Sequence, residues 1–108
     1  MEKIKGFQKR FLRGLAHALK PVVFVGQKGF SPTLVKAMDE ALDRHELVKV
    51  KFVEFKEKEK KTALVQQLEK AADCELVGLV GHMATFYRQQ TEPEKRKIVL
   101  PDRAVSKS

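Results

Sequence analysis

A short apolar strand that runs into a helix through two glycines is the feature that most constrains this chain. Val22–Val25 are all β-branched or aromatic, a composition typical of a buried strand. Gly26 ends the strand, while Ser31 and Pro32 suit the N-cap and the first position of a helix. The glycine loop, Gly26-Gln27-Lys28-Gly29, is therefore predicted to join a strand tightly to a helix N-terminus.

This glycine loop has two interpretations. Glycines let another backbone approach closely, and the free N–H groups at a helix start attract anions. Lys28 adds a full positive charge. A nucleic-acid phosphate would therefore suit the loop, as it does the G-x-x-G loops that hold RNA backbone in KH domains. In the alternative interpretation, the two glycines only make a tight turn.

Positive charge is concentrated around this loop. The net charge of the chain is +8. Residues 1–36 contain eight Lys or Arg and one acidic residue, whereas residues 37–108 contain fourteen basic and thirteen acidic residues. Nearly all of the excess charge thus lies in the first third of the chain. Charge focused in this way points to a polyanionic partner.

Residues 7–19 have the periodicity of an amphipathic helix. Its apolar face is expected to cover the core and consists of Phe7, Phe11, Leu12, Leu15, Ala18 and Leu19. The opposite face gathers cations without an acid, namely Lys5, Lys9, Arg13 and Lys20, with Arg10 at its edge. We interpret this basic face as a site for RNA phosphates. The alternatives are an ordinary solvated face, which usually mixes charges of both signs, and a helix lying on a membrane surface.

The rest of the chain predicts two helices and three strands. The helices are expected over 32–44 and 59–72, and the strands over 47–53, 75–80 and 83–88. The first two strands of the chain, with the helix between them, form a βαβ unit, in which the strands are parallel. Gly81-His82 is a plausible hairpin turn between the last two strands.

Two further pairs of residues are candidates for RNA contacts. Lys49 and Lys51 alternate with apolar residues along one strand, so they either contact RNA or lie on a solvated sheet face. Tyr87 and Arg88 resemble a stacking platform for a base with a cation beside it. The alternative for Tyr87 is a half-buried structural position on the sheet.

The sequence lacks the common signatures of catalysis and metal binding. It has no C-x-x-C, H-x-x-x-H or G-x-x-x-x-G-K-[ST] motif, and its three histidines are spread over separate predicted elements. We therefore expect no enzyme, metal, cofactor or small-molecule substrate. Cys74 is the one cysteine, and no stretch has the apolar length of a signal peptide core or a membrane span. These features predict a cytoplasmic protein that binds no membrane.

Taken in order, these segments resemble the CRM domain family (chloroplast RNA splicing and ribosome maturation), in its single-domain bacterial YhbY-like form. The resemblance covers about residues 7–101, and it departs from the family at Ala72-Asp73-Cys74, where a glycine is common, and at His82, a position often basic. The matching segments are Gly14-Leu-Ala-His17, Leu19-Lys-Pro-Val22, Gly26-Gln-Lys-Gly29, His45-Glu-Leu-Val-Lys-Val50, Phe86-Tyr-Arg88 and Arg96-Lys-Ile-Val-Leu-Pro101.

The resemblance implies a mixed α/β (α+β) fold of order α-β-α-β-α-β-β. Its four-stranded mixed sheet is packed with helices, similar to the C-terminal domain of a bacterial translation initiation factor. It also implies RNA binding without catalysis, in association with precursors of the large ribosomal subunit, with the glycine loop as an RNA-contact element. The domain is expected over 1–101, with Ile98–Leu100 docked on it and a flexible tail over 102–108. We expect a monomer. The alternative function is a protein-interaction module that docks on an acidic partner.

Overall fold

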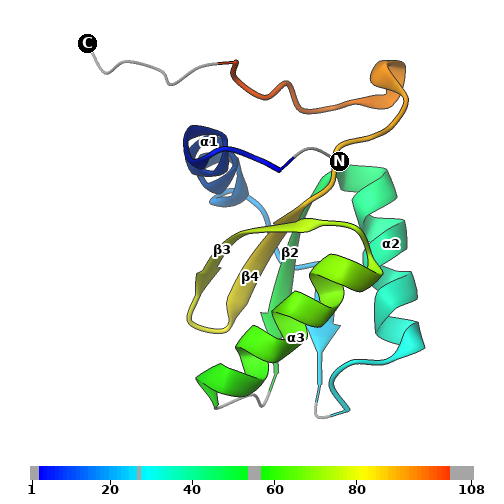
Figure 1. The fold of residues 1–108 in the computed structure, drawn as a ribbon. Helices are drawn as coiled ribbons and strands as arrows, with labels where there is room; N and C mark the ends of the chain where they lie inside the picture. The colour runs from blue at the N-terminus through cyan, green and yellow to red at the C-terminus, as the bar shows by residue number, and fades with distance from the viewer. Residues whose placement is uncertain (1–2, 27, 54–56, 103–108) are drawn as a thin grey trace.

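The computed structural model describes residues 3–26, 28–53 and 57–102, and within these ranges it has the predicted order α-β-α-β-α-β-β (Figure 1). A short 3-10 turn, η1 (Pro93–Lys95), follows the last strand. The other elements are α1 (Gly6–Ala16), β1 (Val23–Val25), α2 (Pro32–His45), β2 (Leu47–Phe52), α3 (Lys58–Ala71), β3 (Glu75–Val80) and β4 (Met83–Tyr87).

The four strands form one mixed sheet in the order β1-β2-β4-β3. β1 and β2 are parallel, which confirms the predicted βαβ unit, and β4 is antiparallel to both of its neighbours. β1 and β3 therefore lie at the two edges of the sheet. The fold class predicted from the sequence is confirmed.

The sheet has a core on each face. The larger core lies between the sheet and the helices α2 and α3, and includes Met38, Val50, Leu68 and Phe86. On the opposite face, α1 and the C-terminal segment cover a smaller core (Figure 1). This smaller core consists of Ile4, Leu12, Ala16, Leu47, Val77 and Tyr87, with Ile98 and Leu100 packed against it.

Helix α1 is turned differently from the prediction. Leu12 is buried as expected, but Phe11, Leu15 and Leu19 are 38%, 41% and 39% exposed. The side of α1 that meets the sheet includes two of the predicted solvent-facing cations. Lys9 pairs with Glu75 at 3.5 Å, and Arg13 donates to the carbonyl oxygen of Val77 at 3.0 Å. The expectation that the apolar face of this helix covers the core, with its basic face free, is therefore wrong for Phe11, Leu15 and Leu19 and for Lys9 and Arg13.

A glycine on β3 makes room for this packing. A Cβ atom at Gly78 would lie 3.0 Å from Cδ of Arg13, closer than side-chain carbons normally approach. The alkyl stem of Arg13 thus lies against the sheet while its guanidinium reaches a backbone carbonyl, a common way for a long cation to cover apolar surface.

Helix α1 also ends three residues earlier than predicted. The ammonium of Lys49 donates to the carbonyl oxygens of Ala16 at 2.9 Å and Leu19 at 3.2 Å. Ala16 is the last residue of α1, and its carbonyl oxygen also accepts from the N–H of Leu19 at 3.0 Å. Lys49 is half-buried and holds the end of α1 on β2.

The C-terminal segment is fastened to the fold by a buried carboxylate. Glu46 follows α2 with a left-handed φ of 62° and is 1% exposed. Its two carboxylate oxygens accept from the backbone N–H groups of Gln90 at 2.8 Å, Lys97 at 2.6 Å and Ile98 at 3.0 Å. Ile98 and Leu100 then pack on the smaller core, as predicted. The predicted tail lies outside the described residues, apart from Asp102.

Candidate nucleic-acid interface

The glycine loop lies at the lower end of the molecule in Figure 1, between the end of β1 and the start of α2. The N–H of Gly29 donates to the carbonyl oxygen of Gly26 at 3.0 Å and closes the turn. Gly29 has a φ of 65°, a left-handed conformation that glycine adopts without strain. Lys28 is exposed, and Gln27 lies outside the described residues.

The start of α2 has the predicted capping. The hydroxyl oxygen of Ser31 accepts from the N–H of Leu34 at 3.1 Å, and Pro32 occupies the first helical turn. The first turn of α2 contains no acidic side chain. The partial positive charge of this helix end is therefore not neutralised within its own first turn.

A groove of about 660 Å³ runs beside the loop. It is bounded by β1, the glycine loop and the first turns of α2, and Phe24, Gly26, Lys28 and Thr33 all line it. Because β1 is an edge strand of the sheet, its side away from β2 has no neighbouring strand among the described residues. The groove thus combines open strand backbone with a cation and a helix N-terminus.

The remaining predicted cations fall into two groups. Lys9, Arg13 and Lys49 hold α1 to the sheet through the contacts described above. The other group is exposed and makes no ion pair with a described residue, and it consists of Lys5, Arg10, Lys20, Lys28 and Lys51. The members of this second group are available to a ligand without breaking the fold.

Residues 4–88 match the sequence model of the CRS1 / YhbY (CRM) domain. The chain belongs to this CRM domain family. It is 37% identical to an RNA-binding protein of Haemophilus influenzae over 94 residues, which cover 87% of this chain and 91% of that protein. It is 36% identical to the probable RNA-binding protein YqeI of Bacillus subtilis, over 91% of this chain and 99% of that one.

A solved structure is also similar to this CRM domain. It is the solution structure of a Staphylococcus aureus protein described as a candidate RNA-binding protein. The two chains are 34% identical, with a TM-score of 0.77, and the match covers 92% of this chain and all of the other. The family and the fold thus agree with the resemblance drawn from the sequence.

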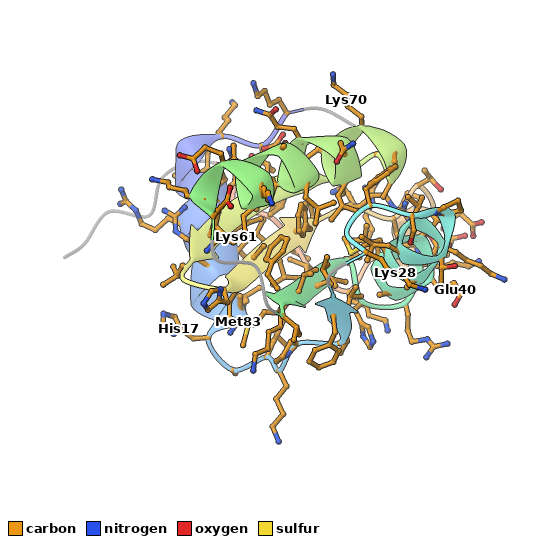
Figure 2. All side chains as sticks on the ribbon, turned by 90° about the horizontal axis from the view of Figure 1, so that it is seen from below. His17, Lys28, Glu40, Lys61, Lys70 and Met83 are labelled. Atoms are coloured by element: carbon orange, nitrogen blue, oxygen red, sulfur yellow. The ribbon has the colours of Figure 1, made fainter. Side chains whose placement is uncertain are left out.

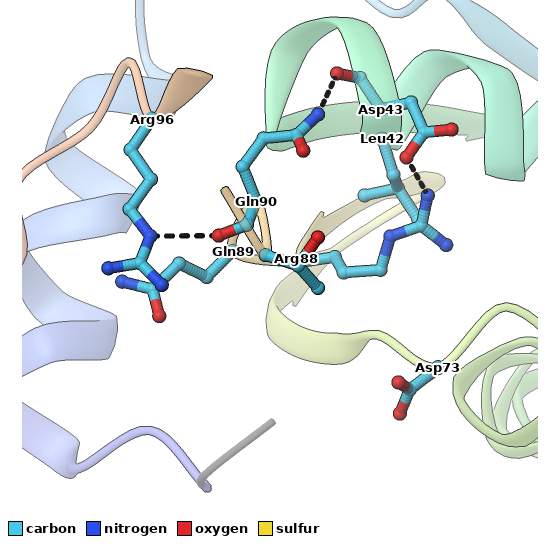
Figure 3. A pocket seen from close by; sticks show the side chains of 8 residues that line it. Leu42, Asp43, Asp73, Arg88, Gln89, Gln90 and Arg96 are labelled. Carbon is cyan, nitrogen blue, oxygen red and sulfur yellow. Dashed lines mark hydrogen bonds and ion pairs between the residues drawn. The ribbon is translucent and has the colours of Figure 1, made fainter. Parts of the chain in front are cut away.

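In this CRM domain Arg88 has a structural role. Its guanidinium donates to a carboxylate oxygen of Asp43 at 2.9 Å (Figure 3). It also donates to a carboxylate oxygen of Asp39 at 2.6 Å and to the carbonyl oxygens of Ala72 and Asp39 at 2.7 and 2.9 Å. These contacts tie the end of β4 to α2 and to the end of α3. The side chain is only 16% exposed. Four of its five N–H donors are thus used within the fold, and an RNA contact of Arg88 stays a prediction.

Tyr87 is likewise part of the core. It is fully buried against Leu12, Leu47 and Val77, so neither face of its ring is open to a base. Burial, with Glu46 nearby, raises the pKa of Tyr87 to about 12. Tyr87 is therefore buried more deeply than the half-buried alternative expected, and its burial does not favour the stacking interpretation.

The raised pKa values of Tyr87 and Cys74 predict alkaline instability. Burial, followed by the charge of Glu69, raises the pKa of Cys74 from 9.0 to about 12. Both groups lose their protons more readily in the unfolded chain, so stability is retained below pH 9 and lost as the pH rises toward 12. We expect a loss on the order of 3 kcal/mol by pH 11 in urea unfolding. Tyr87→Phe should make the alkaline loss of stability shallower. An unchanged loss in this variant would contradict the contribution of the Tyr87 hydroxyl.

Two other sequence-based expectations concern ligands and membranes. Within the described ranges, no group of three or more His, Cys, Asp and Glu side chains gathers as a metal site. The same residues include no helix long and apolar enough to cross a membrane.

Sequence reasoning missed the exposure of Phe24, an aromatic residue of β1. Phe24 was expected inside a buried strand, but it is 59% exposed, and Val22 beside it is 52% exposed. Val23 and Val25 are buried, so β1 alternates between its two faces. The alternation was invisible in the sequence because both faces of this strand are apolar.

Proposed function

We propose that this CRM domain binds RNA backbone through the glycine loop and the exposed cations around it. The observation that carries the proposal is the placement of Lys28 and Gly29 before a helix whose first turn has no acidic residue. The turn is closed by the Gly29–Gly26 hydrogen bond, and the exposed ammonium of Lys28 makes no ion pair with a described residue. Phosphate oxygens suit this site because N–H donors and a positive charge converge on it. The names of the curated relatives support the choice of ligand.

The proposed surface extends from the loop along the free cations. Beyond the loop, the proposal includes the exposed cations Lys5, Arg10, Lys20 and Lys51. Residues 3–38 contain no acid, so no carboxylate in this part of the chain opposes a phosphate. Gln27 stays in the proposal as a residue of the loop.

The natural RNA, we propose further, is ribosomal RNA in precursors of the large ribosomal subunit. The resemblance to the CRM domain family supports this target. The protein would act in the cytoplasm as a monomeric assembly factor that holds RNA without cutting it. Sucrose-gradient sedimentation of a lysate, followed by cross-linking of the tagged protein to RNA, tests this target.

The salt dependence of the RNA affinity tests whether the domain binds phosphates. If the loop and the free cations neutralise about four to six phosphates, a plot of log K against log salt concentration should slope at about −3 to −5. Fluorescence anisotropy with a labelled ribosomal RNA fragment measures this slope at constant pH. Intact RNA at the end of the titration is expected. A flat salt response would contradict phosphate binding.

A second function has one observation in its favour. The exposed side chains of Phe11 and Leu15 on α1, and of Leu19 just after it, are apolar, and Leu15 and Leu19 line a groove of about 410 Å³. Such side chains could dock a protein, with RNA binding incidental. RNase treatment separates the two functions, because ribosome association carried by RNA is lost and association carried by a protein partner is retained.

A further inference from the structure

One end of the sheet face opposite α2 and α3 is uncovered, and its side chains form a row. Phe24 pairs with Lys51, Lys51 with Met83, and Met83 with Val80, so the row crosses all four strands. Paired residues in neighbouring strands project to the same face of a sheet. Helix α1 covers only the other end of this face, where it packs on Leu47 and Val77.

This open row is apolar and accessible. Phe24 is 59% exposed and Val80 is 79% exposed, while Met83 is half-buried and Lys51 is exposed. A single exposed apolar side chain is ordinary, but several in one row mark a site of interaction. The row therefore offers one aromatic ring, two aliphatic surfaces and one free cation on a single plane.

A hollow continues the row toward α1. It has a volume of about 270 Å³ and lies between α1 and the β3–β4 hairpin. Val80 and Met83 line it with apolar side chains. Arg13, His17 and Lys49 also line it and contribute nitrogen-bearing side chains. His17 and Met83 lie beside each other when the molecule is seen from below (Figure 2). The hollow thus has apolar walls and a nitrogen-bearing rim.

The charge around the row is of one sign. α1, β1, β2 and β4 contain no acidic residue. On β3 the one acid, Glu75, is buried and paired with Lys9. The other described acids lie on α2 and α3, near their ends, or on the C-terminal segment. A ligand for this face therefore needs negative charge together with flat apolar surfaces, and unpaired nucleotides have both.

The row is continuous with the glycine loop. Phe24 lies in the row and also lines the groove that contains Gly26 and Lys28. Four strands span three spacings, about 14 Å in all, which is room for two or three splayed nucleotides. Four-stranded sheets with exposed aromatic rings bind two or three RNA bases in this way in RRM domains. A duplex cannot use such a row, because its base faces are already stacked.

We propose that the open row of Phe24, Lys51, Met83 and Val80 binds unpaired RNA bases, so that the domain prefers single-stranded RNA. The inference rests on the proposed function. A strand held by its phosphates at the glycine loop passes over β1, where a base stacks on the ring of Phe24. Lys51 contacts the backbone of the same strand, and the next base lies over Met83 toward the hollow.

Phe24→Ala tests the stacking, with Phe11→Ala as a matched control. Each variant removes one exposed phenyl ring, from the row in one case and from α1 in the other. The probes are a fluorescein-labelled 12-nucleotide single-stranded RNA of mixed sequence and a perfect RNA duplex of the same length. The wild type should bind the single strand more tightly. Phe24→Ala should weaken this binding by about five- to a hundredfold, and Phe24→Tyr should restore it.

The salt slope separates stacking from charge. Phe24→Ala should leave the slope of log K against log salt unchanged, whereas Lys51→Ala should make it shallower by about one. Duplex binding should be the same for Phe24→Ala and wild type. Equal binding of single strand and duplex by the wild type, or wild-type affinity of Phe24→Ala, would overturn the inference.

A measurement on the unmodified protein completes the test. RNA containing 4-thiouridine should cross-link on irradiation to peptides that contain Phe24 or Met83. Cross-links confined to residues of the glycine loop would overturn the inference that the open row binds bases. Phe24-dependent binding to phosphatidylglycerol vesicles, with RNA binding unaffected, would also overturn it. Failure of the proposed function is distinct, since neither RNA probe would then bind in a salt-dependent way.

Discussion

Replacing Glu46 with alanine is expected to lower the free energy of unfolding by about 3–5 kcal/mol, because three buried backbone N–H donors lose their acceptor and each unpaired donor costs about 1–3 kcal/mol. The carboxylate of Glu46 is 1% exposed and accepts from the N–H groups of Gln90, Lys97 and Ile98. Without it, these three donors must either stay unpaired or leave the core. The C-terminal segment should therefore detach from the smaller core.

Urea unfolding and hydrogen exchange together measure this effect. Exchange should rise over residues 90–98 in Glu46→Ala and stay low in α2. Alanine is the right replacement, because glycine would also relieve the left-handed φ of 62° and mask part of the loss.

Glu92→Ala is the control for Glu46→Ala. Glu92 makes a surface ion pair with Lys95 at 3.3 Å, and both side chains are more than half exposed. Pairs of this kind contribute about 0–1 kcal/mol, so Glu92→Ala should be close to wild type. A Glu46→Ala protein that unfolds within 1 kcal/mol of wild type, with residues 90–98 still protected, would show that the carboxylate is not what fastens the segment.

The parts of the fold that depend on neighbouring residues were predictable. The cap at Ser31 and the proline after it placed the start of α2 at the observed residue, Pro32. The strand 75–80 was predicted with its observed bounds, since Gly81 marks the turn that follows. The glycine loop was placed correctly for the same reason, because strand composition, glycine and capping signals all lie within twelve residues.

The parts that depend on distant residues were not predictable in this way. Arg13 bonds a backbone carbonyl 64 residues away, and the three donors to Glu46 come from 44 to 52 residues further along the chain. Periodicity assigns a cation to a polar face, but it cannot show that this face contacts a carbonyl or carboxylate group of another element. The same limit hid the role of Arg88, whose partners lie on α2 and at the end of α3.

This distinction decides which variants can test RNA binding. Reversing the charge of Lys9 and Arg13 would remove contacts between α1 and β3, so lost binding could reflect a damaged fold. Lys20, Lys28 and Lys51 have no such contacts with described residues. Substitutions at these three lysines therefore report on the ligand alone, and the glycine loop offers one further position with the same advantage.

Gly26→Asp is expected to weaken RNA binding more than Lys28→Ala does. Lys28→Ala removes one exposed cation, worth about 1 kcal/mol, or about fivefold in affinity. An aspartate at Gly26 places a negative charge where a phosphate should lie. Two unit charges 4 Å apart repel by about 1 kcal/mol in water and about 4 kcal/mol near a protein surface, so a loss of about fivefold to several hundredfold is expected. RNA titration by anisotropy measures both variants.

Gly26 suits this experiment better than Gly29, because a Cβ at Gly26 meets no atom within 4 Å and its φ is not left-handed. Any side chain at Gly29 would be strained by the φ of 65°, and stability would change with binding. Gly26→Asn has the shape of the aspartate without its charge, so the difference between the two variants isolates repulsion of a phosphate. If both melt like wild type and bind RNA equally well, no phosphate lies at the glycine loop, and the RNA must be held elsewhere on the surface.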